Sequence, residues 1–175
     1  MKLVFPDMRY KEKAIQFINE FHAYNSDISG SGSLDSYLEK STYEQWLQRV
    51  IADLDIANIL PSRAPSFTYF YIREEDDKIV GMINIRFVLN DFLRKEGGHI
   101  GYCIRPTERK KHYATNMLHA ALEICDKLEI HEVIVSCDQS NVASAKVIQN
   151  CGGALEAEFY SETFHEIIQR YIIKR

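Results

Sequence analysis

One stretch near the middle of the sequence, residues 98–128, constrains the fold more than any other. Apolar residues take every second position from Ile100 to Ile104, which is the period of a β-strand. Pro106 lacks the backbone N–H that a neighbouring strand would need, so it ends the strand. From Ala114 to Leu128 apolar residues recur every three or four positions. This spacing predicts a long helix with one buried face, soon after the strand.

The loop that joins this strand to the helix is basic and reads Arg-Lys-Lys-His-Tyr-Ala over residues 109–114. A loop that opens a helix leaves several backbone N–H groups unpaired, beside the positive end of the helix dipole. Such a junction can bind phosphate. Neither GxxxxGK(S/T) nor GxGxxG, two common nucleotide-binding motifs, is present. The alternative is a solvated basic turn between two core elements.

The run from Ile104 to Thr115 resembles the acyl-CoA pyrophosphate loop of the GNAT superfamily of N-acetyltransferases. The family pattern is Arg/Gln-x-x-Gly-x-Gly/Ala, and Arg109 and Ala114 match it. His112 stands where the family usually has glycine. Histidine can substitute there if its side chain points away or its backbone takes a tolerated conformation, including a left-handed one.

A second segment, residues 141–152, resembles the family's Asn-x-x-Ser/Ala-x-x-Leu/Val-Tyr/Ile-Glu-x-x-Gly pattern. Asn141 could simply cap a helix, but the resemblance implies that it contacts CoA. The cosubstrate implied is acetyl-CoA, with no metal. The residues implied in binding it are Cys103, Ile104, Arg105, Arg109, Lys110, Lys111, His112, Tyr113, Ala114, Thr115, Asn141 and Ser144.

The overall composition fits one domain covering residues 1–175. A net charge of −4 argues against a nucleic-acid partner, and no apolar run is long enough to span a membrane. The start of the sequence does not resemble a signal peptide. The four cysteines are widely spaced, which favours reduced core thiols in a cytoplasmic protein over a zinc or redox site.

The remaining patterns predict an α/β fold. Strands are expected at about 3–5, 67–73, 79–88, 99–105, 132–138, 154–160 and 166–173, and helices at about 9–24, 41–57 and 114–128. The helix at 41–57 is expected to stop by Pro61, and a further helix begins at Ser140 or Asn141 and ends at Gly152-Gly153. A flexible Gly/Ser loop covers residues 25–33.

The strand–helix–strand order around residues 114–128 predicts a right-handed crossover that places strands 99–105 and 132–138 in parallel. The hairpins at 67–88 and 154–173 predict antiparallel neighbours, so we expect a mixed, mostly antiparallel sheet with flanking helices. The resemblance extends over nearly the whole chain. It implies that the central parallel pair splays apart around the acyl thioester. It also places the acceptor site at the first two helices, their loop and the final hairpin.

The activity implied is acetyl transfer from acetyl-CoA to a primary amine by direct attack, without a covalent enzyme intermediate. The acceptor could be a small molecule, a peptide N-terminus or a lysine. A backbone N–H between Cys103 and Arg105 could polarise the thioester carbonyl. The family's tyrosine acid falls on Ile148, so its role cannot be transferred. Candidate acids and bases are His99, Tyr102, Glu96 and Tyr160, with Tyr171 a further hydroxyl.

Several alternatives remain. His99 could be a structural imidazole, and a chain of water molecules could remove the amine proton. The whole domain could be a non-catalytic acyl-CoA-binding module, or an unrelated α/β nucleotide binder. Strands near the C-terminus could supply an edge for a homodimer.

Overall fold

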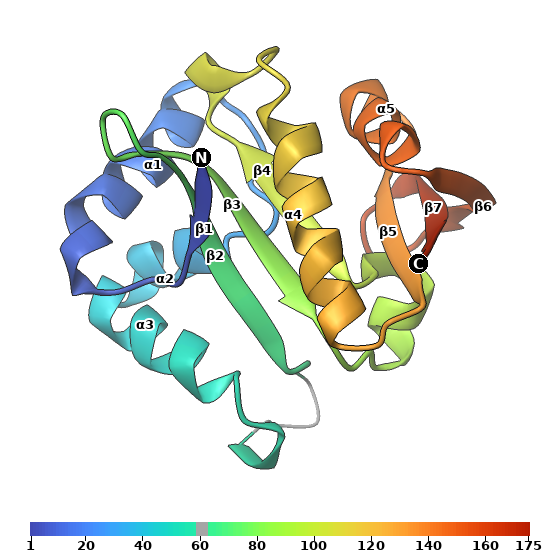
Figure 1. Ribbon diagram of the computed structural model, residues 1–175, viewed down its shortest axis with the longest axis horizontal. Helices are drawn as coiled ribbons and strands as arrows, with labels where there is room; N and C mark the ends of the chain where they lie inside the picture. The colour runs from blue at the N-terminus through green and yellow to red at the C-terminus, as the bar shows by residue number, and fades with distance from the viewer. Residues whose placement is uncertain (59–62) are drawn as a thin grey trace.

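The computed structural model describes residues 1–58 and 63–175, which form two antiparallel sheets with flanking helices (Figure 1). The first half contains β1 (Lys2–Val4), α1 (Lys11–Ala23), α2 (Leu34–Lys40), α3 (Tyr43–Ala52), β2 (Ser66–Arg73), β3 (Lys78–Arg86) and β4 (Ile100–Ile104). The second contains α4 (Tyr113–Lys127), β5 (Glu132–Asp138), α5 (Val142–Asn150), β6 (Gly153–Ser161) and β7 (Glu166–Lys174). Short 3-10 turns lie at Met8–Tyr10, Ile56–Asn58 and Pro106–Glu108, and a π-helical turn lies at Leu93–Gly97.

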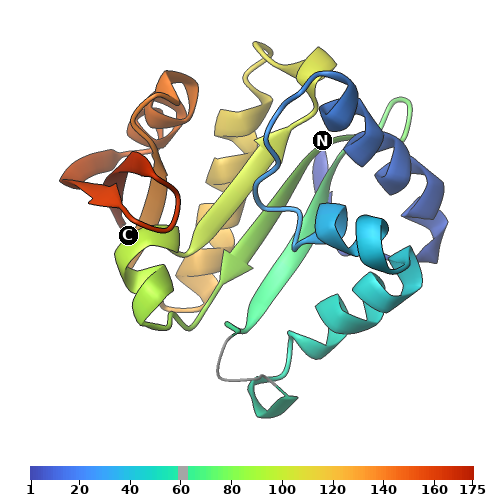
Figure 2. The same cartoon turned by 180° about the vertical axis from the view of Figure 1, so that it is seen from behind.

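The first sheet has the strand order β1-β2-β3-β4, and helices cover both of its faces (Figure 2). Side chains alternate between the faces along each strand. Ile83 and Ile100 pack against α4, while Phe70 and Met82 pack against the cluster that includes Trp46 of α3. Because both faces are covered, the strands read as nearly continuous apolar runs, and β3 is buried from residue 79 to residue 85.

The second sheet has the order β5-β7-β6, and α5 packs beside it. Its strand β5 has the predicted bounds, 132–138, and the final hairpin β6–β7 is antiparallel as expected. Val133 and Val135 are fully buried against the same core as α4. The helix α4 therefore joins the two sheets through one shared apolar cluster.

The predicted parallel pairing of the strands at 99–105 and 132–138 is not confirmed, because every described ladder is antiparallel. Strands β4 and β5 instead form edges of different sheets and meet at one end. There, His99 N donates to Ile134 O at 2.7 Å, and Ile134 N donates to the His99 ring Nδ1 at 2.9 Å. The imidazole takes the donor that a parallel ladder would use, and no other backbone bond joins β4 to β5 in the described part of the chain.

Two other expectations need correction. The helix expected at 41–57 ends at Ala52, because the chain turns at Asp53 and forms a separate 3-10 turn at 56–58. Its predicted stop by Pro61 lies outside the described residues. An additional short helix, α2, follows the Gly/Ser loop directly, since Ser33 takes a left-handed conformation (φ 62°) that starts it.

Candidate functional site

The basic loop before α4 contains two residues with left-handed backbone. Lys110 has φ 63° and His112 has φ 60°, conformations that favour glycine but that polar residues such as asparagine, aspartate and histidine adopt more readily than most. His112 thus adopts the left-handed conformation available to the glycine that the family usually has at this position. Its side chain is exposed and makes no capping bond to the helix. The turn at this position is therefore built without glycine.

The N–H groups of this loop are free to bind an anion. In residues 1–58 and 63–175, no acceptor takes the backbone N–H of any residue from 110 to 115, and the first such bond comes from Asn116 to His112 O at 3.1 Å. The first turn of α4 contains no acidic residue and no side-chain cap. Unpaired donors therefore lie at the positive end of the helix dipole.

Arg109 fixes the loop to the rest of the fold. Its Nε donates to Ile104 O at 3.2 Å and its Nη2 donates to Ser26 Oγ at 2.7 Å. The guanidinium carbon also lies 5.6 Å from the centre of the Phe21 ring. Arg109 consequently joins the loop to β4, to α1 and to the start of the Gly/Ser segment, which accounts for its place in the loop whether or not it reaches a ligand.

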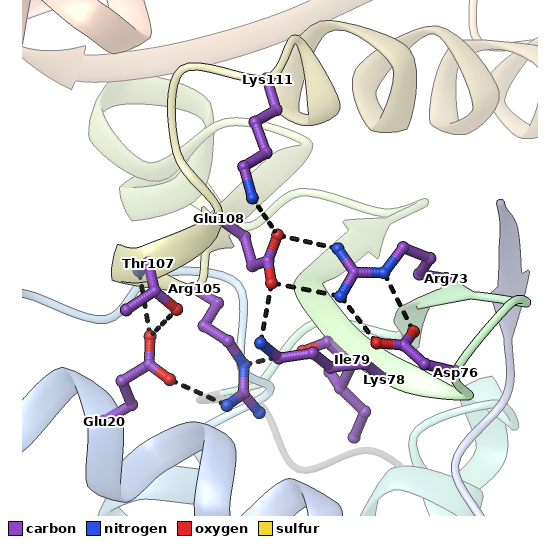
Figure 3. A network of polar contacts seen from close by, with 9 residues as sticks. All are labelled: Glu20, Arg73, Asp76, Lys78, Ile79, Arg105, Thr107, Glu108 and Lys111. Atoms are coloured by element: carbon purple, nitrogen blue, oxygen red, sulfur yellow. Dashed lines mark hydrogen bonds and ion pairs between the residues drawn. The ribbon is translucent and has the colours of Figure 1, made fainter.

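Glu108 holds three cations beside the loop (Figure 3). Its carboxylate lies 2.9 Å from Arg73, 2.7 Å from Lys78 and 2.8 Å from Lys111. Burial alone would raise the pKa of Glu108, but the hydrogen bonds from these cations lower it to about 2. Because Arg73 also binds Asp76 at 2.7 Å, the cluster retains one net positive charge next to the predicted phosphate site.

Arg105 points away from the loop and is used inside the fold. Its Nε donates to Ile79 O and its Nη1 to Glu20, both at 2.9 Å, as Figure 3 shows. The other oxygen of Glu20 accepts both from the N–H and from the hydroxyl of Thr107. These contacts anchor the turn after β4 on α1, and the guanidinium of Arg105 does not face the unpaired amides.

Strand β4 pairs with β3 on one side only, and its other, free edge faces the separation between the first and second sheets. Arg105 N donates to Val80 O at 2.9 Å, and peptide groups alternate in direction along an antiparallel strand. The N–H groups of Tyr102 and Ile104 therefore point away from β3, whereas Cys103 is directed toward β3. Burial raises the pKa of the Cys103 thiol to about 12, so this cysteine is not a thiolate at neutral pH.

Tyr102 and Ser144 meet across this separation, one from β4 and one from α5. The Tyr102 hydroxyl lies 2.9 Å from Ser144 Oγ. Burial raises the pKa of Tyr102 above its ordinary value, so the hydroxyl keeps its proton at neutral pH. Asn141 caps α5 by accepting the N–H of Ser144 at 3.1 Å, the simpler of the two interpretations of its position. At the other end of α5, Cys151 Sγ lies 3.8 Å from Thr115 O of α4.

The other candidate acids and bases do not gather there. Glu96 is buried in the π-helical turn and accepts from Ser161 Oγ at 2.6 Å. Tyr160 lies on β6 with 52% of its surface exposed, and Tyr171 is buried with its hydroxyl on Gln169. The structure therefore brings Tyr102 and Ser144 together, and leaves Glu96 and Tyr160 in separate surroundings.

His99 is a hydrogen-bonded structural imidazole, the alternative to a catalytic base for this residue. Its Nδ1 accepts the Ile134 N–H, so the neutral ring carries its proton on Nε2. Burial, together with the neighbouring charges of Arg94 and Arg86, lowers the pKa of His99 to about 4. An imidazole with a pKa this low is a weak base at neutral pH.

We expect His99→Asn to change how stability depends on pH. The unfolded ring titrates near 6.5 and the folded ring near 4, so acid protonates the unfolded chain first and stability is lost as pH falls from about 6.5 to about 4. Over this pH range the free energy of unfolding should fall by on the order of 3 kcal/mol. Asparagine can accept the Ile134 N–H without titrating. Urea unfolding at pH 7 and pH 4.5 should show a smaller loss for His99→Asn, while the exposed His119→Asn should match the wild type.

A cavity of about 430 Å³ lies on the opposite face of the first sheet from α4. The Gly/Ser loop, α2, α3 and the ends of β2 and β3 form its walls. Gly30 (φ 71°) packs on the backbone of Gly101 in β4, and a Cβ at Gly30 would overlap it. The charged residues of the cavity were not singled out from the sequence, where they read as ordinary polar ends of helices and strands. They are Asp35, Arg49, Asp53, Arg63 and Arg86.

No helix within the described ranges is long and apolar enough to cross a membrane. Within the same ranges, no group of three or more histidine, cysteine, aspartate or glutamate residues could hold a metal ion.

Comparison with known proteins adds the following. A family model described as "Acetyltransferase (GNAT) domain" matches residues 18–154. No curated protein sequence matches the chain significantly. Similar solved structures include ribosomal-protein-S5-alanine acetyltransferase from Vibrio fischeri, with 17% identity, 99% of this chain and 91% of that chain covered, and a TM-score of 0.67.

Two further structures are similar to the same extent. The microcin C7 self-immunity acetyltransferase MccE, in complex with acetyl-CoA and AMP, has 17% identity and a TM-score of 0.71, over 99% of this chain and 91% of that chain. A spermidine N-acetyltransferase chimera from Vibrio cholerae and hSSAT has 14% identity and a TM-score of 0.66, over 99% and 96%. At these identities the likeness concerns the fold.

Proposed function

We propose, because this chain belongs to the GNAT acetyltransferase family, that it transfers an acetyl group from acetyl-CoA to a primary amine by direct attack. The observation that carries the proposal is the row of unpaired backbone N–H groups from residue 110 to residue 115 at the start of α4. Unpaired N–H groups at the start of a helix are suited to bind a diphosphate. Acetyl-CoA is also the ligand named for MccE, one of the similar structures.

The loop residues would bind acetyl-CoA mostly through their main chain. The N–H groups before and within the first turn of α4 hold the diphosphate, and Ala114 leaves room for it. Lys110 and Lys111 add long-range positive charge, although Lys111 shares its charge with Glu108. Ser144 on α5 and Asn141, which caps that helix, lie across the separation between the sheets, where the acyl arm would run.

The reaction needs one bond formed and one broken. The neutral amine nitrogen attacks the thioester carbon, the C–N bond forms, the C–S bond breaks, the amine loses a proton and the thiolate gains one. The N–H groups on the free edge of β4, at Tyr102 and Ile104, are suited to stabilise the negative charge that develops on the carbonyl oxygen. The thiol of Cys103 takes no part in this scheme.

Tyr102 is the best placed of the candidate hydroxyls to protonate the thiolate. It is the one that faces the separation between β4 and α5, where it meets Ser144, and it is protonated at neutral pH. His99 is unsuited as the base because its acceptor nitrogen is already bonded. Glu96 stays a candidate through its buried carboxylate, and water remains the alternative that needs no side chain.

A non-catalytic acyl-CoA-binding module is the second candidate. Ile148, fully buried, occupies the position at which many family members have a tyrosine acid. The two proposals separate in one experiment. The protein is mixed with acetyl-CoA and a broad panel of primary amines, and both free CoA and acetylated products are measured, the latter by mass spectrometry. Amine-dependent CoA release supports the transferase. Tight acetyl-CoA binding without release from any amine supports the binding module.

Two further parts of the proposal concern the surroundings of the protein. The four cysteines are free thiols, which supports a reducing compartment such as the cytoplasm.

The final hairpin exposes apolar Leu155, Phe164 and Ile167, and β6 is an edge strand. An exposed edge with apolar side chains suits pairing with a second copy, which supports a homodimer. Sedimentation at several protein concentrations tests it.

A further inference from the structure

Arg86 presents an unpaired positive charge to the cavity between the Gly/Ser loop and the sheet. Its guanidinium donates through Nη1 to the carbonyls of Gly97 and Gly98, at 3.2 Å and 3.1 Å. No carboxylate of the described residues pairs with it, and residues 59–62, Ile-Leu-Pro-Ser, contain no acid. Its other nitrogens have no protein partner and are not sealed from solvent, so they are open to a ligand.

The surroundings of Arg86 make this charge costly. Burial lowers the pKa of its guanidinium below its ordinary value, and no neighbouring charge is large enough to counteract the effect. A cation that is largely shielded from water without a counterion is destabilising, and an anionic ligand that supplies the missing charge reduces this cost. Guanidinium groups bind carboxylate and phosphate oxygens in pairs.

Apart from Arg86, the charged residues that line the cavity are two arginines and two aspartates, and all but one of them are paired with each other. Asp53 already binds both Arg49 at 2.7 Å and Arg63 at 3.4 Å, so two cations share one carboxylate. Asp35 is the exception: it accepts from Ser31 Oγ at 2.6 Å and has no cationic partner among the described residues. The lining therefore has a surplus of positive charge and one separate unpaired carboxylate.

We propose that this cavity binds the acceptor, and that the acceptor is an amine that also carries a carboxylate or phosphate group, held by Arg86. The inference rests on the proposed transferase function. Asp35 supplies the charge that attracts the ammonium end. The cavity is of the size that holds a small molecule, and Gly30 places its wall against β4, next to the strand that would present the thioester.

Matched pairs of acceptors test the proposal. In each pair one member lacks the anion: 4-aminobutanoate with 4-aminobutanamide, and O-phosphoethanolamine with ethanolamine. We expect wild-type kcat/KM to be at least about 10-fold higher for the anionic member of at least one pair. A preference in the first pair identifies the anionic group of the acceptor as a carboxylate, and a preference in the second identifies it as a phosphate. Arg86→Gln, which removes the positive charge and keeps a polar amide, should lower kcat/KM for that anionic member by about 10- to 100-fold, mainly through KM. The neutral amines should react as before.

Arg94→Gln is the matched control, because Arg94 is an exposed arginine of the π-helical turn that Arg86 contacts, and it does not line the cavity. It should keep the anion preference. Calorimetry with the same four compounds and CoA-saturated protein gives a second readout that needs no turnover. No preference for either anion in wild-type rates or binding overturns the inference, as does an equal loss for anionic and neutral amines in Arg86→Gln. If acetyl-CoA binds but no amine is acetylated, the transferase function itself fails.

Discussion

Replacing Ala114 with glutamate should abolish acetyl-CoA binding while the protein stays folded. Ala114 lies in the first turn of α4, is partly buried, and belongs to the run of unpaired N–H groups from residue 110 to residue 115. A glutamate there puts bulk and negative charge where the diphosphate would bind. The affinity should fall at least about 100-fold, equivalent to about 3 kcal/mol, in isothermal titration calorimetry.

The helix itself should tolerate the change, because acidic residues are favourable in the first turn of a helix. Asn116→Glu is the matched control: it adds the same charge to the same turn on an exposed side chain. Circular dichroism should show both variants folded, and only Ala114→Glu should lose binding. Wild-type affinity in a folded Ala114→Glu protein would place the phosphate site elsewhere and remove the main support for the proposed function.

The second large effect is expected for Tyr102→Phe, which removes one hydroxyl and keeps the ring. If Tyr102 protonates the departing thiolate, kcat should fall by about 100-fold, and KM for acetyl-CoA should change little. Ser144 loses a hydrogen-bond partner, which costs on the order of 1 kcal/mol of stability. Single-turnover measurements separate the chemical step from product release.

Tyr160→Phe is the comparison for this variant, since Tyr160 is exposed on β6 and bonded to no partner in the described parts of the chain. It should turn over at the wild-type rate. A full rate in Tyr102→Phe across the pH range would mean that solvent supplies the proton, and Tyr102 would then have only a packing role in the separation between the sheets.

Much of the fold could be read from the sequence because local patterns decide it. β5 is a run of apolar residues between polar ones, and its predicted bounds match. The parallel pairing of residues 99–105 with 132–138 is not confirmed, and the sequence around residue 99 does not reveal that the His99 ring accepts the Ile134 N–H that such a ladder would use. The helix α2 was missed because its seven residues follow a Gly/Ser segment and carry too short a pattern.

The candidate site was also predicted only in part. The phosphate loop could be predicted because its donors belong to the backbone of a strand–loop–helix junction, whatever the side chains are. Arg86 could not, because it is the last residue of an apolar strand, where arginine is ordinary in sequence. Its missing counterion is a property of the surrounding turns and helices, which come from distant parts of the chain.

The meeting of β4 and β5 at one end has a consequence for motion. In the described protein, the edges of β4 and β5 are joined only by the two hydrogen bonds between His99 and Ile134. The peptide groups farther along β4, at Tyr102 and Ile104, have no hydrogen-bond partner on β5. Their amide hydrogens should exchange with deuterated solvent faster than those of Cys103, which faces β3. An acyl arm bound between the sheets would bridge two edges that share no backbone ladder in the described part of the chain. Slower exchange on both edges would then report how firmly the substrate itself completes the centre of the fold.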